Sequence, residues 1–155
     1  MRGRESELMD MALADLRRLG YAVSYPDPVL SFGRKVRQLS RQQEHFNALI
    51  QVRAHQPADY RYLVGLVIPE MRRVATVIIW CENERKLFQI PTGILCDILD
   101  EREDLGDAKY ATRGRQWRVD FHLDEEALSP QGSGGERYSI SQYSVSLSTG
   151  NAKRA

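Results

Sequence analysis

The run "ENERK", residues 82–86, places a glutamate and a lysine two positions apart, at Glu84 and Lys86. On a strand, side chains with this spacing project from one face. A carboxylate and an ammonium group could then hold a metal ion and position the attacking water. The run lies, however, between the apolar segments "VATVIIW" and "KLFQI", and a few polar residues between two such segments are typical of a hairpin turn. We therefore predict that Glu84 and Lys86 are exposed in a turn and lie far from any cleft.

A second set of polar side chains alternates with apolar ones in "HFNALIQVRAH", residues 45–55, which predicts a half-buried strand. The apolar face would carry Phe46, Ala48, Ile50 and Val52. The other face would carry His45, Asn47, Gln51, Arg53 and His55, with Leu49 among them. Amide and guanidinium groups read base edges and bind phosphates. This face is either part of a nucleic-acid groove beside the basic segment 34–41 or the solvated side of an edge strand.

Charge is unevenly distributed along the chain, although the formal net charge is only +1. The basic side chains of residues 33–53 are Arg34, Lys35, Arg37, Arg41 and Arg53, against Glu44 alone, which is a local excess of +4. Residues 97–107 contain six acidic residues against Arg102, a local excess of −5. The basic segment is a candidate phosphate-binding surface, and the acidic segment is a candidate surface for a protein partner.

The periodicity of apolar residues predicts the elements that position these groups. Residues 5–19 form one amphipathic helix that ends at Gly20, and residues 92–102 form a second helix, capped by Thr92. Residues 28–43 are expected to form a short helix or an ordered basic loop. The segment "YRYLVGLVI", residues 60–68, is apolar on both faces and is typical of a central strand.

Two further strands are predicted towards the end of the chain. In "WRVDFHL", residues 117–123, Trp117 and Phe121 would face inward while Asp120 and His122 face outward. "RYSISQYSVSL", residues 137–147, would be a last strand with a bulge near Ser141. The whole pattern predicts a single α+β domain over residues 1–148, with a flexible tail at 149–155. Its sheet would be mixed or largely antiparallel, with about six strands and two or three helices.

The order of a helix, the segment "YAVSYPD" and the strand "FNALIQVR" resembles the restriction-endonuclease-like fold, the PD-(D/E)XK family. The resemblance covers about the first ninety residues. It implies an acidic residue at Asp27, after Pro26, and an acidic-x-Lys pair at Gln51 and Arg53. Here an amide replaces the acid and a guanidinium replaces the amine. A neutral amide is a poor metal ligand, and arginine is too basic to transfer a proton. The resemblance therefore implies a nuclease-like scaffold with a degenerate catalytic motif.

Three functions remain open from the sequence. The first is a non-catalytic nucleic-acid-associated module, of a kind found in bacterial defence or mobile-element systems, with double-stranded DNA or RNA as its partner. The predicted contacts are Arg34, Lys35, Arg37, Arg41, Asn47, Gln51 and Arg53. The second is a metal-dependent endonuclease using Mg²⁺ with Asp27, Glu44, Gln51 and Arg53. The third is a protein-interaction module that uses the acidic segment 97–107.

Further expectations concern cofactors and location. Outside the nuclease alternative we expect no metal and no cofactor, because the two cysteines, Cys81 and Cys96, have no histidine at metal-ligand spacing. No apolar run approaches the ~20 residues that span a bilayer. The first ten residues contain no apolar stretch of the kind that a secretory signal requires. We therefore expect no membrane partner and a cytoplasmic location.

Overall fold

The computed structural model describes residues 3–26, 35–53, 61–67, 73–82, 84–99, 116–130 and 137–147, and the statements below concern these residues. Two α-helices, α1 (Gly3–Arg18) and α3 (Thr92–Leu99), accompany two sheets. The larger sheet contains β1 (Ala22–Ser24), β2 (Val36–Arg41), β3 (Glu44–Arg53), β5 (Thr76–Cys81), β6 (Lys86–Pro91) and β10 (Ser144–Ser146). The smaller sheet contains β4 (Arg61–Val67), β7 (Gln116–His122), β8 (Ala127–Pro130) and β9 (Tyr138–Ser139).

The larger sheet has six strands in the order β1-β2-β3-β5-β6-β10, and all its neighbours are antiparallel except β3 and β5. The smaller sheet is antiparallel, in the order β4-β7-β8-β9. The predicted α+β domain with a largely antiparallel sheet of about six strands is confirmed. The predicted hairpin around "ENERK" is also present, because β5 and β6 pair directly across it.

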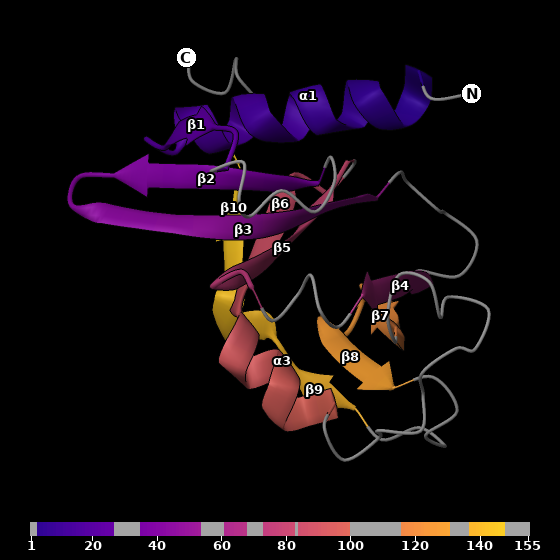
Figure 1. Ribbon diagram of the computed structural model, residues 1–155. Coiled ribbons are helices and arrows are strands. Elements are labelled where there is room, and N and C mark those ends of the chain that lie inside the picture. Colours follow the sequence, from indigo (N-terminus) through magenta and orange to yellow (C-terminus); the bar gives the residue numbers. More distant parts are fainter. Residues whose placement is uncertain are drawn as a thin grey trace.

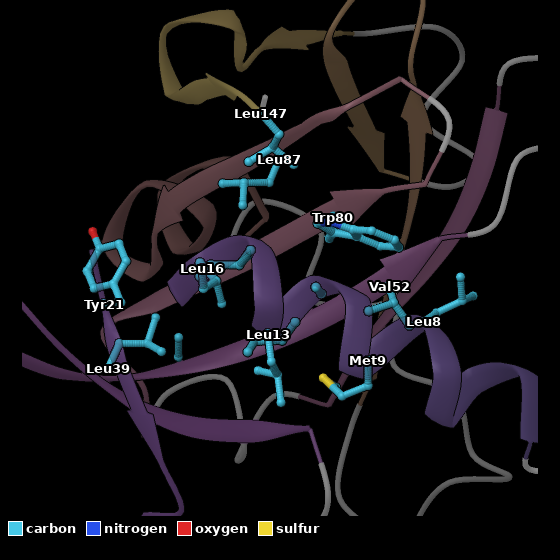
Figure 2. Close-up of a cluster of buried hydrophobic side chains, with 14 residues drawn as sticks. Leu8, Met9, Leu13, Leu16, Tyr21, Leu39, Val52, Trp80, Leu87 and Leu147 are labelled. Atoms are coloured by element: carbon cyan, nitrogen blue, oxygen red, sulfur yellow. The ribbon is translucent and has the colours of Figure 1, made fainter. Parts of the chain in front are cut away.

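The larger sheet separates two apolar cores. Helix α1 lies along one face (Figure 1), where its buried side chains pack on alternate residues of the sheet. Figure 2 shows this cluster, in which Leu13 and Leu16 of α1 lie against residues from the strands, such as Trp80 and Leu87. Helix α3 and the smaller sheet contribute to the core on the opposite face, where Leu95 and Phe121 pack with Leu49. The central strands are therefore buried on both faces.

The end of α1 is fixed by Gly20, which has a φ of 102°. The Gly20 amide donates to the carbonyl of Arg17, and the Tyr21 amide donates to the carbonyl of Leu16. These two bonds form a Schellman motif, in which glycine is favoured because it adopts a left-handed conformation without strain. The motif reverses the chain, so that β1 returns antiparallel to β2 beside the helix.

Several local predictions were wrong. Residues 36–41 form β2 instead of a helix or loop, because Val36 faces one core and Leu39 faces the other. The segment predicted as a central strand is β4, which lies at the edge of the smaller sheet and pairs with β7. The predicted last strand is two strands, β9 and β10, joined by the 3-10 helix η4 (Ser141–Tyr143), and each belongs to a different sheet.

The helix predicted over residues 92–102 is present as α3, and residues 100–102 lie outside the described part of the chain. The Thr92 hydroxyl donates to the carbonyl of Val74 at 2.9 Å, which joins the start of α3 to the segment that precedes β5. The predicted tail at 149–155 also lies outside the described residues.

Candidate functional site

Arginine and tyrosine side chains alternate with apolar ones along the edge that β1 and β2 form. In the register of this pair, Val23 lies opposite Leu39. Extending the same register by two residues in each direction sets Tyr21 opposite Arg41 and Tyr25 opposite Arg37. Residues two apart on a strand share a face, and Leu39 packs in the α1 core. Both tyrosine–arginine pairs therefore belong to the face of the sheet that carries α1.

The outer pair consists of Tyr25 and Arg37. The Arg37 guanidinium carbon lies 4.5 Å from the centre of the Tyr25 ring, a cation–π contact. Arg37 is only 8% exposed, and its Nη1 donates to the Val36 carbonyl at 3.1 Å. Tyr25 is 76% exposed. The Arg37 guanidinium, which is fixed by this hydrogen bond, thus packs against one face of the Tyr25 ring, and the rest of the ring is exposed to solvent.

The inner pair consists of Tyr21 and Arg41, whose guanidinium carbon is 4.2 Å from the centre of the Tyr21 ring. Arg41 Nη1 donates to the carbonyl of Leu19 at 3.1 Å. Arg41 also passes close beneath Gly20, where an added Cβ would lie 3.2 Å from Arg41 Cδ. The glycine that ends α1 therefore also makes room for the arginine that stacks on Tyr21.

A pocket of about 610 Å³ opens beside this inner pair. The residues that line it include Tyr21, Arg41, Glu44, Phe46, Thr76 and Gln89. Tyr21 and Phe46 meet edge to face, with ring centres 5.9 Å apart. Gln89 Nε2 donates to the Tyr21 hydroxyl at 3.3 Å, and Figure 2 shows Tyr21 at the margin of the α1 core. The pocket combines aromatic surface with groups that donate and accept hydrogen bonds.

The structure does not bring all the predicted nucleic-acid contacts together. Arg37 and Arg41 project on the α1 face, whereas Asn47 and Gln51 alternate onto the opposite face of β3. Gln51 is only 3% exposed and lies next to the other core. At Gln51 the strand face is therefore not the open polar surface that the alternation predicted, because α3 and the smaller sheet contribute to the core there. Towards the start of β3 the same face is more open, with Asn47 half-buried and His45 exposed.

The remaining predicted contacts are Lys35, Arg34 and Arg53. Lys35 is half-buried just before β2. Arg34 lies outside the described residues, as does the side chain of Arg53 at the end of β3. The members of the predicted set that the structure places on one face of one strand are therefore Arg37 and Arg41.

The predicted nuclease residues that the structure describes do not form a catalytic site. Glu44 extends on the α1 face near Arg41, while Gln51 is buried beneath the opposite face. Asp27 lies outside the described residues. Because Glu44 and Gln51 leave opposite faces of one strand, they do not converge on a common metal ion. More generally, no group of three His, Cys, Asp or Glu side chains suited to a metal ion occurs within the described ranges.

The "ENERK" turn is less exposed than predicted, and its charged side chains have structural partners. Arg85 donates to Asp15 of α1 from Nη1 at 3.1 Å and from Nη2 at 2.9 Å. Lys86 forms an ion pair with Glu126, in the turn between β7 and β8. Glu84 and Lys86 are both partly buried. The turn therefore joins α1 and the smaller sheet to the larger one.

A buried histidine–serine pair was also not predicted. His122 was expected to face outward, but it is only 7% exposed, and its Nε2 lies 2.7 Å from Ser129 Oγ. The alternation along the strand predicted an exposed His122, and this prediction was wrong because β7 is covered on both faces here. Phe121, on the other face, is also buried. Asp120 lies in register with Ser129, and its side chain is outside the described set.

The remaining candidate groups are described only in part. Among the charged side chains of the acidic segment 97–107, the described one is that of Asp97, and it is exposed. Cys81 is buried and Cys96 is half-buried, and neither forms a disulfide. Neither α1 nor α3 is long and apolar enough to cross a membrane.

Comparison with models of known protein families, with curated protein sequences and with solved structures finds no match to this chain.

Proposed function

We propose that this protein is a nucleic-acid-binding module without catalytic chemistry, and that it contacts unpaired bases through the edge formed by β1 and β2. The observation that carries the proposal is the Tyr25 ring, which is 76% exposed and is supported from one side by the Arg37 guanidinium. A base that stacks on an aromatic side chain contributes about 1–3 kcal/mol. An isolated exposed tyrosine is mobile, whereas this ring is held against a nearly buried cation.

The surrounding charges support the same ligand. Arg17 lies exposed in the last turn of α1, Lys35 lies just before β2 and Arg41 lies at its end. Asp15, the acidic residue of that part of α1, is 3% exposed and already accepts hydrogen bonds from Arg85. These basic side chains outnumber Glu44, the exposed carboxylate beside Arg41, so backbone phosphates can bind to this face while bases stack on the ring.

Fluorescence anisotropy with labelled oligonucleotides tests the proposal. We expect short single-stranded RNA or DNA to bind more tightly than a blunt duplex, because paired bases cannot stack on Tyr25. The logarithm of the affinity should fall with the logarithm of the salt concentration, by about 0.7 for each phosphate contact. Tyr25→Leu should weaken binding about tenfold, and Tyr25→Phe should retain it.

Arg137→Ala is the matched control, because Arg137 is an exposed arginine beside the smaller sheet and pairs with Glu125. It should leave the affinity unchanged. The proposal is overturned if no strand binds at ~50 mM salt, where non-specific electrostatic binding is strong, or if Tyr25→Leu binds as tightly as the unchanged protein. The same oligonucleotides incubated with Mg²⁺ test the nuclease alternative, which requires cleavage that Asp27→Ala abolishes.

A further inference from the structure

We infer that the pocket beside Tyr21 and Arg41 holds one unpaired nucleobase and selects bases that carry an exocyclic amino group, namely cytosine, adenine and guanine, over uracil and thymine. The inference rests on the proposed function and extends it from binding to base selection. It is carried by the juxtaposition of a guanidinium, a carboxylate and two aromatic rings around a volume of about 610 Å³. This volume lies within the range of pockets that hold small ligands, roughly 300–1,000 Å³.

The aromatic part of the pocket is held in place before any ligand arrives. Tyr21 is only 5% exposed, and its ring contacts Arg41 on one side and the edge of Phe46 on another. Its hydroxyl accepts a hydrogen bond from Gln89 Nε2, which orients the amide of Gln89 within the lining. A planar ligand that enters the pocket therefore meets rings whose positions are already fixed, which lowers the entropic cost of binding.

The polar part of the pocket contains a hydrogen-bond donor and an acceptor that are not hydrogen-bonded to each other. Arg41 Nη2 and Glu44 Oε1 lie 4.0 Å apart, which is beyond hydrogen-bond distance. The Glu44 side chain is 62% exposed. A ligand that presents both an acceptor and a donor can therefore contact the guanidinium and the carboxylate at the same time.

The carboxylate gives the pocket its preference among bases. An ionised carboxylate only accepts hydrogen bonds. Cytosine offers a donor at its N4 amino group, and adenine and guanine offer donors at N6 and N2. Thymine, and uracil likewise, carry the O4 acceptor at this position and have their donor at N3–H, so the order of acceptor and donor along this edge is the reverse of that in cytosine. Cytosine therefore accepts from Arg41 at N3 and donates to Glu44 from N4. Uracil in the same position would set its N3–H against the guanidinium and its O4 against the carboxylate, so Glu44 beside Arg41 is the specificity-determining residue.

The pocket lies on the same face of the larger sheet as the exposed ring that carries the proposed function. Tyr21 and Tyr25 are four residues apart along an extended segment, a separation of about 13 Å at the usual rise per residue. Both rings lie over arginines of the same neighbouring strand, β2. A single strand whose base stacks on Tyr25 can therefore place another base of the same strand in the pocket.

Oligocytidine and oligouridine of equal length provide the test, because their bases have the same size and differ only in the donor and acceptor at positions 3 and 4. We expect the unchanged protein to bind oligocytidine about tenfold more tightly, as for loss of a hydrogen bond to a charged group. Glu44→Gln should bring the ratio close to one, because an amide can also donate to O4 of uracil. Tyr25→Leu should weaken the binding of both strands and preserve their ratio, and Arg137→Ala should change neither.

A titration with cytidine and uridine monophosphates separates the two proposals, because a mononucleotide can occupy the pocket without the Tyr25 ring. Cytidine monophosphate should shift the NMR signals of the Gln89 side-chain amide and the Thr76 backbone amide, and uridine monophosphate should shift them less. Equal binding of both strands, with no difference between the two mononucleotides, overturns base selection and leaves the proposed function standing. Failure of every strand overturns the proposed function. In that case, shifts of these signals by cytidine monophosphate would still support a base-binding pocket, and the absence of any shift would overturn it.

Discussion

Asp15 shows how one buried charge connects distant parts of the chain. Its carboxylate is 3% exposed and accepts hydrogen bonds from Trp80 Nε1 at 2.8 Å, from both terminal nitrogens of Arg85, and from Arg18 at 2.5 Å. A buried carboxylate is tolerable only when its oxygens are paired in this way. Asp15 therefore fixes α1 against β5 and against the turn that follows it.

Replacing Asp15 with alanine should lower the free energy of unfolding by about 3 kcal/mol, because it leaves the Trp80 indole and Arg85 without their acceptor. Urea denaturation followed by tryptophan fluorescence measures this loss. Arg18→Ala is the control, since Arg18 is 56% exposed and such ion pairs contribute about 0–1 kcal/mol. Equal losses in the free energy of unfolding for the two substitutions would mean that the buried hydrogen bonds of Asp15 do not stabilise the fold more than a surface ion pair does.

At the scale of elements, the β5–β6 hairpin joins the two sheets through its turn. Arg85 adopts a φ of 53°, which aims its side chain at α1, and its carbonyl accepts from the Leu147 amide at 2.9 Å. Lys86 pairs with Glu126, a turn residue of the smaller sheet with a φ of 52°. Two tight turns, about forty residues apart in the chain, therefore meet through one ion pair.

A double-mutant cycle on Lys86→Ala and Glu126→Ala measures that connection. Both side chains are less than a third exposed, at 30% and 22%. We expect a coupling energy of about 1 kcal/mol, at the upper end for partly exposed ion pairs. The coupling should decrease at high salt because ions screen the pair. Strict additivity of the two substitutions would show that the turns are held together by packing alone.

For the whole molecule, the main feature is the core opposite α1, which the two sheets share. Phe121 of β7 is fully buried, and its ring meets Phe88 of β6 edge to face, with ring centres 5.2 Å apart. Ile140, which lies between the strands β9 and β10 of the two sheets, is buried in the same core. Neither sheet buries the side that faces this core without the other, so we expect the two sheets to unfold together.

Replacing Phe121 with alanine should therefore lower the free energy of unfolding by about 3–5 kcal/mol. Far-UV circular dichroism and tryptophan fluorescence should still report a single, coincident transition at a lower urea concentration. A second transition, or a loss restricted to one probe, would indicate that the smaller sheet unfolds independently. Leu128→Ala, at the cross-strand partner of Phe121, should behave in the same way.

The sequence by itself determined the elements with long, unambiguous periodicity. Helix α1 follows from its apolar spacing and Gly20, and the β5–β6 hairpin follows from two apolar runs around "ENERK". In principle the candidate site also had a signal, because "Y-x-V-x-Y" at 21–25 and "R-x-L-x-R" at 37–41 share the period of a strand. Matching two such patterns requires knowing that they pair, and residues 36–41 on their own resembled a helix or loop.

Tertiary structure alone decided which polar faces are open and where short segments belong. Gln51 is buried because α3 and the smaller sheet contribute to the core on its side of β3, which local alternation cannot reveal. The segment 138–146 divides between two sheets because β9 pairs with the nearby strand β8, whereas β10 pairs with β6, which lies far away in the chain. Alternation along a strand specifies two faces, but whether a face meets solvent, a helix or a second sheet depends on contacts between residues distant in sequence.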